Sequence, residues 1–205
     1  MRKITAGLFI SLDGVVENPQ DWHFPYFNEQ MGEAVDAQMS SADTLLLGRR
    51  TYDSFAGAWP EREKAGAEDA AFAKKLGDAR KIVVSTQELD FTWRNSERLK
   101  GDLIEAVTAL KDEPSASDIA ISGSVSLVRR LLAAGLLDEL HLLVHPIAVG
   151  AGMRLFEDLD APLPLQLISS ETFTTGVVHL VYRRDEGAPT GDYAKARESL
   201  PQSAG

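Results

Sequence analysis

Short apolar runs alternate with stretches of helical periodicity along most of the chain. The apolar runs are rich in β-branched residues and predict buried strands, whereas apolar residues recurring every three or four positions predict amphipathic helices. The predicted strands are 3–10, 43–47, 80–85, 119–122 and 137–146, with a short edge strand at 91–94. The predicted helices are 27–40, one that follows Gly48, 67–76, 103–111 and one that begins at Val125. Segments 15–26 and 57–66 carry prolines and are predicted to be loops.

The pattern changes near the end of the chain. Residues 165–173 and 177–183 alternate in polarity around a turn at 174–176, as expected of two antiparallel strands. The fold class predicted is therefore α/β, a three-layer α-β-α sandwich with a mostly parallel sheet and an antiparallel C-terminal hairpin. Residues 1–184 form one predicted domain, and 185–205 lack a core pattern and are predicted to be a mobile or loosely docked tail.

Two stretches run from a strand through a glycine into a helix. In 119–135 the glycine is Gly123, and in 45–55 it is Gly48, which is followed by two arginines and a threonine. Such a turn directs the unpaired N–H groups of the helix start toward a ligand, and phosphate suits that position. Two simpler interpretations stay open: Gly123 only turns the chain while Ser124 caps the helix, and the arginines are a solvated charge pair.

These turns are predicted to lie close together. Gly48, Ser85 and Gly123 each follow a predicted parallel strand. Because ligands bind at the carboxyl ends of strands in such sheets, the three residues predict one shared crevice.

Composition narrows the classes of function. The chain has 205 residues, no cysteine and a formal net charge of −10. The absence of cysteine excludes disulfides and thiolate metal sites, and the negative charge argues against a nucleic-acid partner. The first apolar run is broken by Thr5, Gly7 and Ser11, so it predicts a strand rather than a signal peptide. No apolar stretch is long enough for a membrane span, and no spacing of His, Asp and Glu predicts a metal site.

Five motifs together carry a resemblance to a known family. They are 11–14 (SLDG), 47–52 (LGRRTY), 84–86 (VST), 122–124 (SGS) and 145–156 (HPIAVGAGMRLF). In their order and spacing the chain resembles the dihydrofolate-reductase-like superfamily, and most of all the stand-alone relatives of the reductase domain of the bacterial riboflavin-biosynthesis protein. The resemblance covers residues 2–184. The pair Gly150 and Gly152 lacks a strand-to-helix context and is interpreted as a structural turn rather than a dinucleotide fingerprint.

The resemblance implies an oxidoreductase that uses NADPH. It implies hydride transfer to a C=N or C=O bond of a small heterocycle, either a phosphoribosylaminouracil or a pterin-like compound, by a cytoplasmic homodimer. The residues that would contact the cofactor are Ala6, Gly14, Gly48, Arg49, Arg50, Thr51, Ser85, Thr86, Gly123, Ser124 and Val125. The alternative is a nucleotide-binding module of the same fold without turnover. A serine hydrolase is disfavoured because Ser122-Gly-Ser lacks the nucleophile-elbow motif.

Substrate and proton-donor candidates are less well defined by the sequence. Trp22 and Phe24, in the loop 15–26, either stack on a planar substrate or anchor the loop. Reduction also needs a proton, and the candidate donors are Asp13, Glu33 and Asp36; the alternatives are a turn-forming aspartate and two solvated helix carboxylates. Of the histidines, His141 and His145 are predicted not to be catalytic, and the role of His23 stays open.

Overall fold

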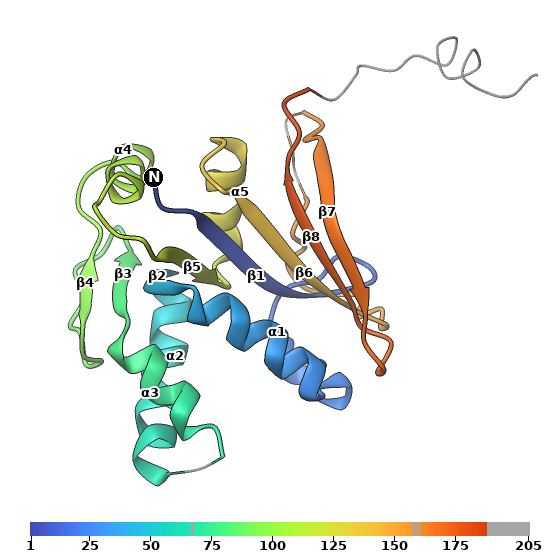
Figure 1. Cartoon of the computed structure of the whole chain (residues 1–205), viewed down its shortest axis with the longest axis horizontal. Helices are drawn as coiled ribbons and strands as arrows, with labels where there is room; N and C mark the ends of the chain where they lie inside the picture. The colour runs from blue at the N-terminus through green and yellow to red at the C-terminus, as the bar shows by residue number, and fades with distance from the viewer. Residues whose placement is uncertain (67, 158, 160, 188–205) are drawn as a thin grey trace, which may run out of the picture.

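An eight-stranded sheet forms the centre of the protein. The computed structural model describes residues 1–66, 68–157, 159 and 161–187, and in this part the strand order is β4-β3-β2-β5-β1-β6-β8-β7 (Figure 1). The strands are β1 (Ile4–Ser11), β2 (Ala42–Gly48), β3 (Arg80–Val84), β4 (Ser96–Arg98), β5 (Asp118–Ser122), β6 (Glu139–His145), β7 (Leu165–Thr172) and β8 (Val178–Arg184). Pairs from β4 to β6 are parallel, and β8 is antiparallel to both β6 and β7. The predicted sheet with its C-terminal hairpin is confirmed.

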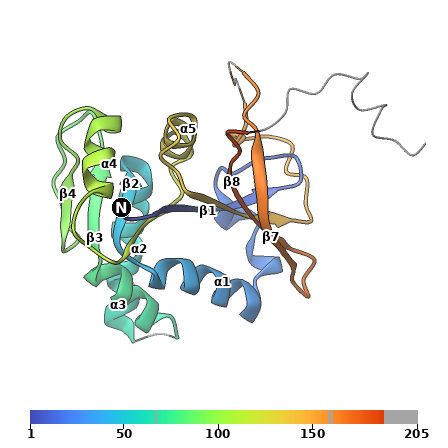
Figure 2. The same ribbon diagram turned by 45° about the horizontal axis from the view of Figure 1, so that its top comes forward.

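Helices cover both faces of the sheet, which gives the three predicted layers. Figure 2 shows α4 (Leu103–Lys111) and α5 (Val125–Ala133) on one face, and α1 (Glu29–Ser40), α2 (Arg49–Ala65) and α3 (Ala70–Asp78) on the other. Two single-turn 3₁₀ helices, Pro19–Asp21 and Phe24–Tyr26, lie between β1 and α1. Among the described residues, no helix is long and apolar enough to cross a membrane.

The alternation of β1 divides the core between the two faces. Ile4, Ala6, Leu8 and Ile10 are buried against α4 and α5. Gly7 points to the opposite face, where a Cβ atom would collide with the side chain of a glutamine on α1. Glycine at this position therefore lets α1 lie close to the central strand. Each fully buried aliphatic side chain contributes about 1.5–3 kcal/mol to this packing.

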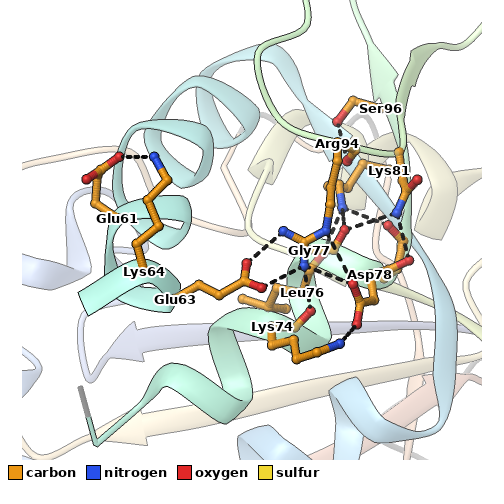
Figure 3. A network of polar contacts seen from close by, with 12 residues as sticks. Glu61, Glu63, Lys64, Lys74, Leu76, Gly77, Asp78, Lys81, Arg94 and Ser96 are labelled. Carbon is orange, nitrogen blue, oxygen red and sulfur yellow. Dashed lines mark hydrogen bonds and ion pairs between the residues drawn. The ribbon is translucent and has the colours of Figure 1, made fainter. Parts of the chain in front are cut away.

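The predicted loop 57–66 is wrong, because α2 continues through it. The helix runs to Ala65 with Pro60 inside, and it ends at Gly66, which has a φ of 63°. Proline removes one helical hydrogen bond, which is why the sequence favoured a loop. A contact from outside the helix reaches its last turns: the carboxylate of Glu63 receives two hydrogen bonds from Arg94, at 2.7 and 3.0 Å (Figure 3).

The predicted edge strand 91–94 is also displaced. The structure places the edge strand at Ser96–Arg98, which pairs with β3 from Lys81 to Val83. The aromatic residues before it are held by side-chain packing instead: Trp93 is buried, and its backbone N–H donates to the hydroxyl of Tyr52 at 3.2 Å. Most of the predicted tail, residues 188–205, lies outside the described residues.

Candidate active site

A large cleft follows the carboxyl ends of β1, β2, β3 and β5. Its volume is about 1770 Å³, and it contains the three positions that the sequence predicted to converge, Gly48, Ser85 and Gly123. The other predicted site residues that line it are Phe24, Asp36, Arg49, Arg50, Thr51, Thr86, Ser124 and Val125. Ala6, Asp13, Gly14, Trp22 and Glu33 are not among the lining residues.

Ser124 joins the starts of α2 and α5. Its hydroxyl oxygen accepts a hydrogen bond from the backbone N–H of Gly48 at 2.6 Å and lies 2.8 Å from the hydroxyl of Thr51. The Ser124 side chain therefore does not cap its own helix. The simpler interpretation of the sequence, in which Ser124 caps the helix that follows it, is wrong. A Cβ atom on Gly48 would lie 2.6 Å from the Ser124 hydroxyl, so glycine is needed for the two helix starts to meet. The contact joins residues 76 positions apart and could not be read from local sequence.

The two joined helix starts form an electropositive end of the cleft. Neither α2 nor α5 has a side-chain cap on its first N–H groups, so these donors are free for a ligand. Two arginines begin α2: Arg49 pairs with Asp53 at 3.2 Å, and Arg50 is exposed and in no ion pair within the described residues. Backbone donors, helix dipoles and a guanidinium together fit the diphosphate and the additional phosphate of a dinucleotide.

The end of β1 and the following loop form another wall. The ring of His23 stacks on Phe9 with centroids 4.5 Å apart, and both residues line the cleft. Burial, with a smaller contribution from His145, lowers the pKa of His23 to about 4, so its imidazole is neutral at pH 7. His145 is fully buried and contacts the carbonyl oxygen of Leu143 through Nδ1, at 2.8 Å. This environment supports the predicted exclusion of His145 from catalysis.

The loop aromatics differ in their placement. Trp22 is buried, its Nε1 donates to the carbonyl of Glu17 at 3.2 Å, and its ring packs edge-on against His145. It therefore anchors the loop, which was the second of the two interpretations of this residue. Phe24 is 59% exposed and lines the cleft, so of the two aromatics it is the one available to a ligand.

Asp13 is engaged in the structure of the turn after β1. Its carboxylate accepts hydrogen bonds from the Ser11 hydroxyl at 2.6 Å and from the backbone N–H groups of Val149 and Gly150 at 3.0 and 2.8 Å. These bonds, the one from Ser11 first, lower the pKa of Asp13 to about 2. An ionised carboxylate outside the cleft lining has no proton to donate at neutral pH. The geometry favours a structural role for Asp13.

The two helix carboxylates point to different places. Asp36 lines the cleft, but it pairs with the ammonium group of Lys75 at 2.6 Å, and a hydrogen bond from Lys75 lowers its pKa. Glu33 lies instead on a second cavity of about 510 Å³ beneath α1, which His141 and His179 also line. Asp36 is therefore not held as a neutral acid, and Glu33 does not line the cleft. In the described residues, no group of three His, Asp or Glu side chains is arranged to hold a metal ion.

One wall of the cleft is aromatic and was not predicted from the sequence. Phe55 and Trp59 on α2 and Phe72 on α3 line it, with ring centroids of Trp59 at 6.1 Å from Phe55 and 5.3 Å from Phe72. The spacing of Phe55, Trp59 and Arg62 places all three on one helical face and could have revealed this wall. The prediction of a loop at 57–66 excluded Trp59 and Arg62 from the helix that carries Phe55.

The fold and the cleft define an α/β protein with a large crevice at the carboxyl edge of its sheet. The model of the family described as "RibD C-terminal domain" matches residues 2–179, and the chain belongs to this family. Two curated relatives, both from Bacillus subtilis strain 168, are the uncharacterized proteins YyaP and YwjB. YyaP is 29% identical over 184 residues, covering 88% of this chain and 94% of the relative. YwjB is 25% identical over 182 residues, covering 86% and 95%.

Solved structures share the fold. A putative riboflavin biosynthesis protein from Shewanella sp. PV-4 has a TM-score of 0.69 at 21% identity, covering 90% of this chain and 99% of that one. A pyrimidine reductase-like protein from Corynebacterium diphtheriae has a TM-score of 0.62 at 15% identity, covering 90% and 92%. The predicted resemblance to riboflavin-type reductases is confirmed at the level of family and fold.

Proposed function

We propose that the protein is an NADPH-dependent reductase that transfers a hydride to a C=N or C=O bond of a small heterocycle. The observation that carries the proposal is the junction of two uncapped helix starts at Ser124, together with Arg50 in the first turn of α2, which is in no ion pair within the described residues. Membership of the RibD C-terminal domain family supports it.

Different residues of the cleft would bind different parts of the cofactor. When bound, NADPH supplies the hydride. The N–H groups at the starts of α2 and α5 would hold the diphosphate, and Arg50 would bind the 2′-phosphate through its paired donors. Ser85 and Thr86, at the end of β3, would border the adenosine. Because the three carboxylate candidates are ionised or outside the cleft lining, we assign the proton to solvent water entering the open cleft.

Comparison of NADPH with NADH tests this proposal. We expect fluorescence titration of the purified protein to give NADPH binding at least about tenfold tighter than NADH binding. Arg50→Ala should remove most of this preference. Arg49→Ala is the matched control, since Arg49 is already paired with Asp53, and it should retain the preference. If neither nucleotide binds, or if both bind equally, the proposal fails.

A nucleotide-binding module without turnover is the second candidate. It is favoured because the pKa values of Asp13 and Asp36 are both lowered, and because Asp13 and Glu33 do not line the cleft. Tight NADPH binding without NADPH oxidation across a panel of pterins, flavins and quinones would support it. We propose in addition that the protein is a homodimer. The cytoplasmic location and the absence of nucleic-acid partners stay predictions.

A further inference from the structure

The cleft is larger than one ligand requires and has a second limb. Pockets for single small molecules usually measure about 300–1000 Å³, whereas this cleft measures about 1770 Å³. Beyond the helix starts, its lining includes residues of α1, α2 and α3. Val35, Phe55, Trp59 and Phe72 line this limb, which we call the aromatic limb.

Within the described residues, the cleft-lining arginines that are in no ion pair lie outside the aromatic limb. Four arginines line the cleft, and two of them, Arg50 and Arg130, are in no ion pair within the described residues. Arg50 lies in the first turn of α2, and Arg130 lies in the last turn of α5. The unpaired positive charge of the cleft lining is therefore carried by the start of α2 and by α5, and none of it belongs to the aromatic limb.

The arginine of the aromatic limb is already paired with a carboxylate. Arg62 pairs with Asp69 at 2.5 Å, and its guanidinium lies 5.1 Å from the centroid of the Trp59 ring. The remaining charged side chains that line this limb are acidic, namely Glu68 and Asp36, and Asp36 is paired with Lys75. An anionic group entering here would lose its hydration without gaining a free basic partner.

We infer that the aromatic limb binds a planar aromatic substrate without phosphate or any other anionic group. The inference rests on the proposed function, in which this substrate accepts the hydride. Aromatic side chains provide apolar area and favourable ring-ring contacts to a planar ligand. The inference selects against the phosphoribosylated substrate that the family resemblance left open.

Riboflavin and FMN are suitable probes, because they share a planar heterocycle and differ by one phosphate. We expect the protein saturated with NADP⁺ to bind riboflavin at least about tenfold more tightly than FMN, measured by quenching of flavin fluorescence. Trp59→Ala should weaken riboflavin binding and leave NADP⁺ binding unchanged. Equal affinities, tighter binding of FMN, or binding of neither flavin would overturn the inference.

Release of Arg62 gives a sharper test. Asp69→Asn removes the carboxylate that pairs with Arg62, and asparagine is as suitable as aspartate at the N-cap of α3, which Asp69 occupies without a side-chain cap bond. We expect FMN binding to strengthen several-fold in this variant while riboflavin binding stays constant. An unchanged FMN affinity would contradict the charge argument.

The two proposals fail separately. If NADP⁺ binds and the flavin preference is absent, only the inference about the aromatic limb fails. If NADP⁺ does not bind, the proposed function fails whatever the flavins do. The same titrations, run without nucleotide, then report on the aromatic limb alone.

Discussion

Asp13 connects two segments that are far apart in the sequence. Its carboxylate accepts a hydrogen bond from the hydroxyl of Ser11, just before it in the chain. It also accepts hydrogen bonds from the backbone N–H groups of Val149 and Gly150 in the glycine-rich loop. Arg154 adds a hydrogen bond to the Asp13 carbonyl at 3.0 Å. The residue therefore fixes the loop after β6 against the exit of β1, beside the cleft.

The lowered pKa of Asp13 predicts an acid-sensitive contribution to stability. The folded-state pKa of about 2 lies below the ordinary 3.8, so the contribution is complete above pH 4 and is lost as pH falls through 2. Urea unfolding between pH 5 and pH 2 should show a shallower loss of stability for Asp13→Asn than for the wild type. The control Asp21→Asn, at an exposed position, should follow the wild-type slope. Equal slopes for Asp13→Asn and wild type would contradict the assigned role.

At the scale of elements, α2 and α3 form a hairpin, and charged side chains contact the last turns of both helices. Arg94 pairs with Glu63 on α2 and with Asp78 on α3, the latter at 2.9 Å (Figure 3). Lys81 on β3 is fully buried, and its ammonium group donates to the carbonyls of Leu76, Gly77 and Ala79 at 2.7–2.8 Å. These contacts fix the hairpin that carries one side of the aromatic limb.

Lys81 should be important for stability. Burial lowers its pKa to about 8, so the group remains charged at pH 7 and can donate all three hydrogen bonds. Lys81→Met would remove one donor from each of three carbonyls at the end of α3, of which Gly77 would keep a hydrogen bond from Asn95. We expect a loss of about 2 kcal/mol, because the hydrogen-bond loss is partly offset by relief of the buried charge.

Urea unfolding at pH 7 checks this value, with Lys74→Met as the control. Lys74 is an exposed lysine paired with Asp78, and such surface pairs contribute about 0–1 kcal/mol. If Lys81→Met and Lys74→Met cost the same, the three carbonyl contacts do not stabilise the end of α3. In that case the hairpin depends on Arg94 and apolar packing.

The same elements show which parts of the fold the sequence could predict. Residues 103–111 form α4 with the predicted bounds, because the helix has a regular apolar face and an aspartate N-cap, Asp102. Within α2, Pro60 argues locally for a loop, whereas the contact of Glu63 with Arg94, 31 residues further along the chain, is not visible in the local pattern. Local patterns identify elements whose stabilising contacts are local.

One part of the candidate site could also be predicted from the sequence, and another part could not. The end at Gly48 and Gly123 was predictable, since a strand, a glycine and a helix in succession place N–H groups at the sheet edge. The aromatic limb was not predicted, since it depends on how α1 packs against α2 and α3. Nor could the sequence reveal that Ser124 serves the neighbouring helix, because its αL conformation, with φ of 66°, is a tertiary feature.

For the whole molecule, the two edges of the sheet differ in how they are protected. The edge strand β4 has only three residues, and short edges resist further pairing. The opposite edge, β7, has eight residues, and Leu167 and Ile168 on it are 49% and 47% exposed. A long edge strand with exposed aliphatic side chains is a surface that proteins normally cover. A second copy of the chain would provide that cover, which agrees with the proposed homodimer.

Disruption of this edge should yield monomers. Sedimentation of the wild type should give twice the chain mass of 22.3 kDa. The double variant Leu167→Asp, Ile168→Asp should sediment as a single chain, because two carboxylates would be desolvated at the contact. Leu12→Asp, at a position that is 68% exposed on the turn after β1, is the control and should remain dimeric. A monomeric wild type would exclude the dimer, whereas a dimeric double variant would place the contact away from β7.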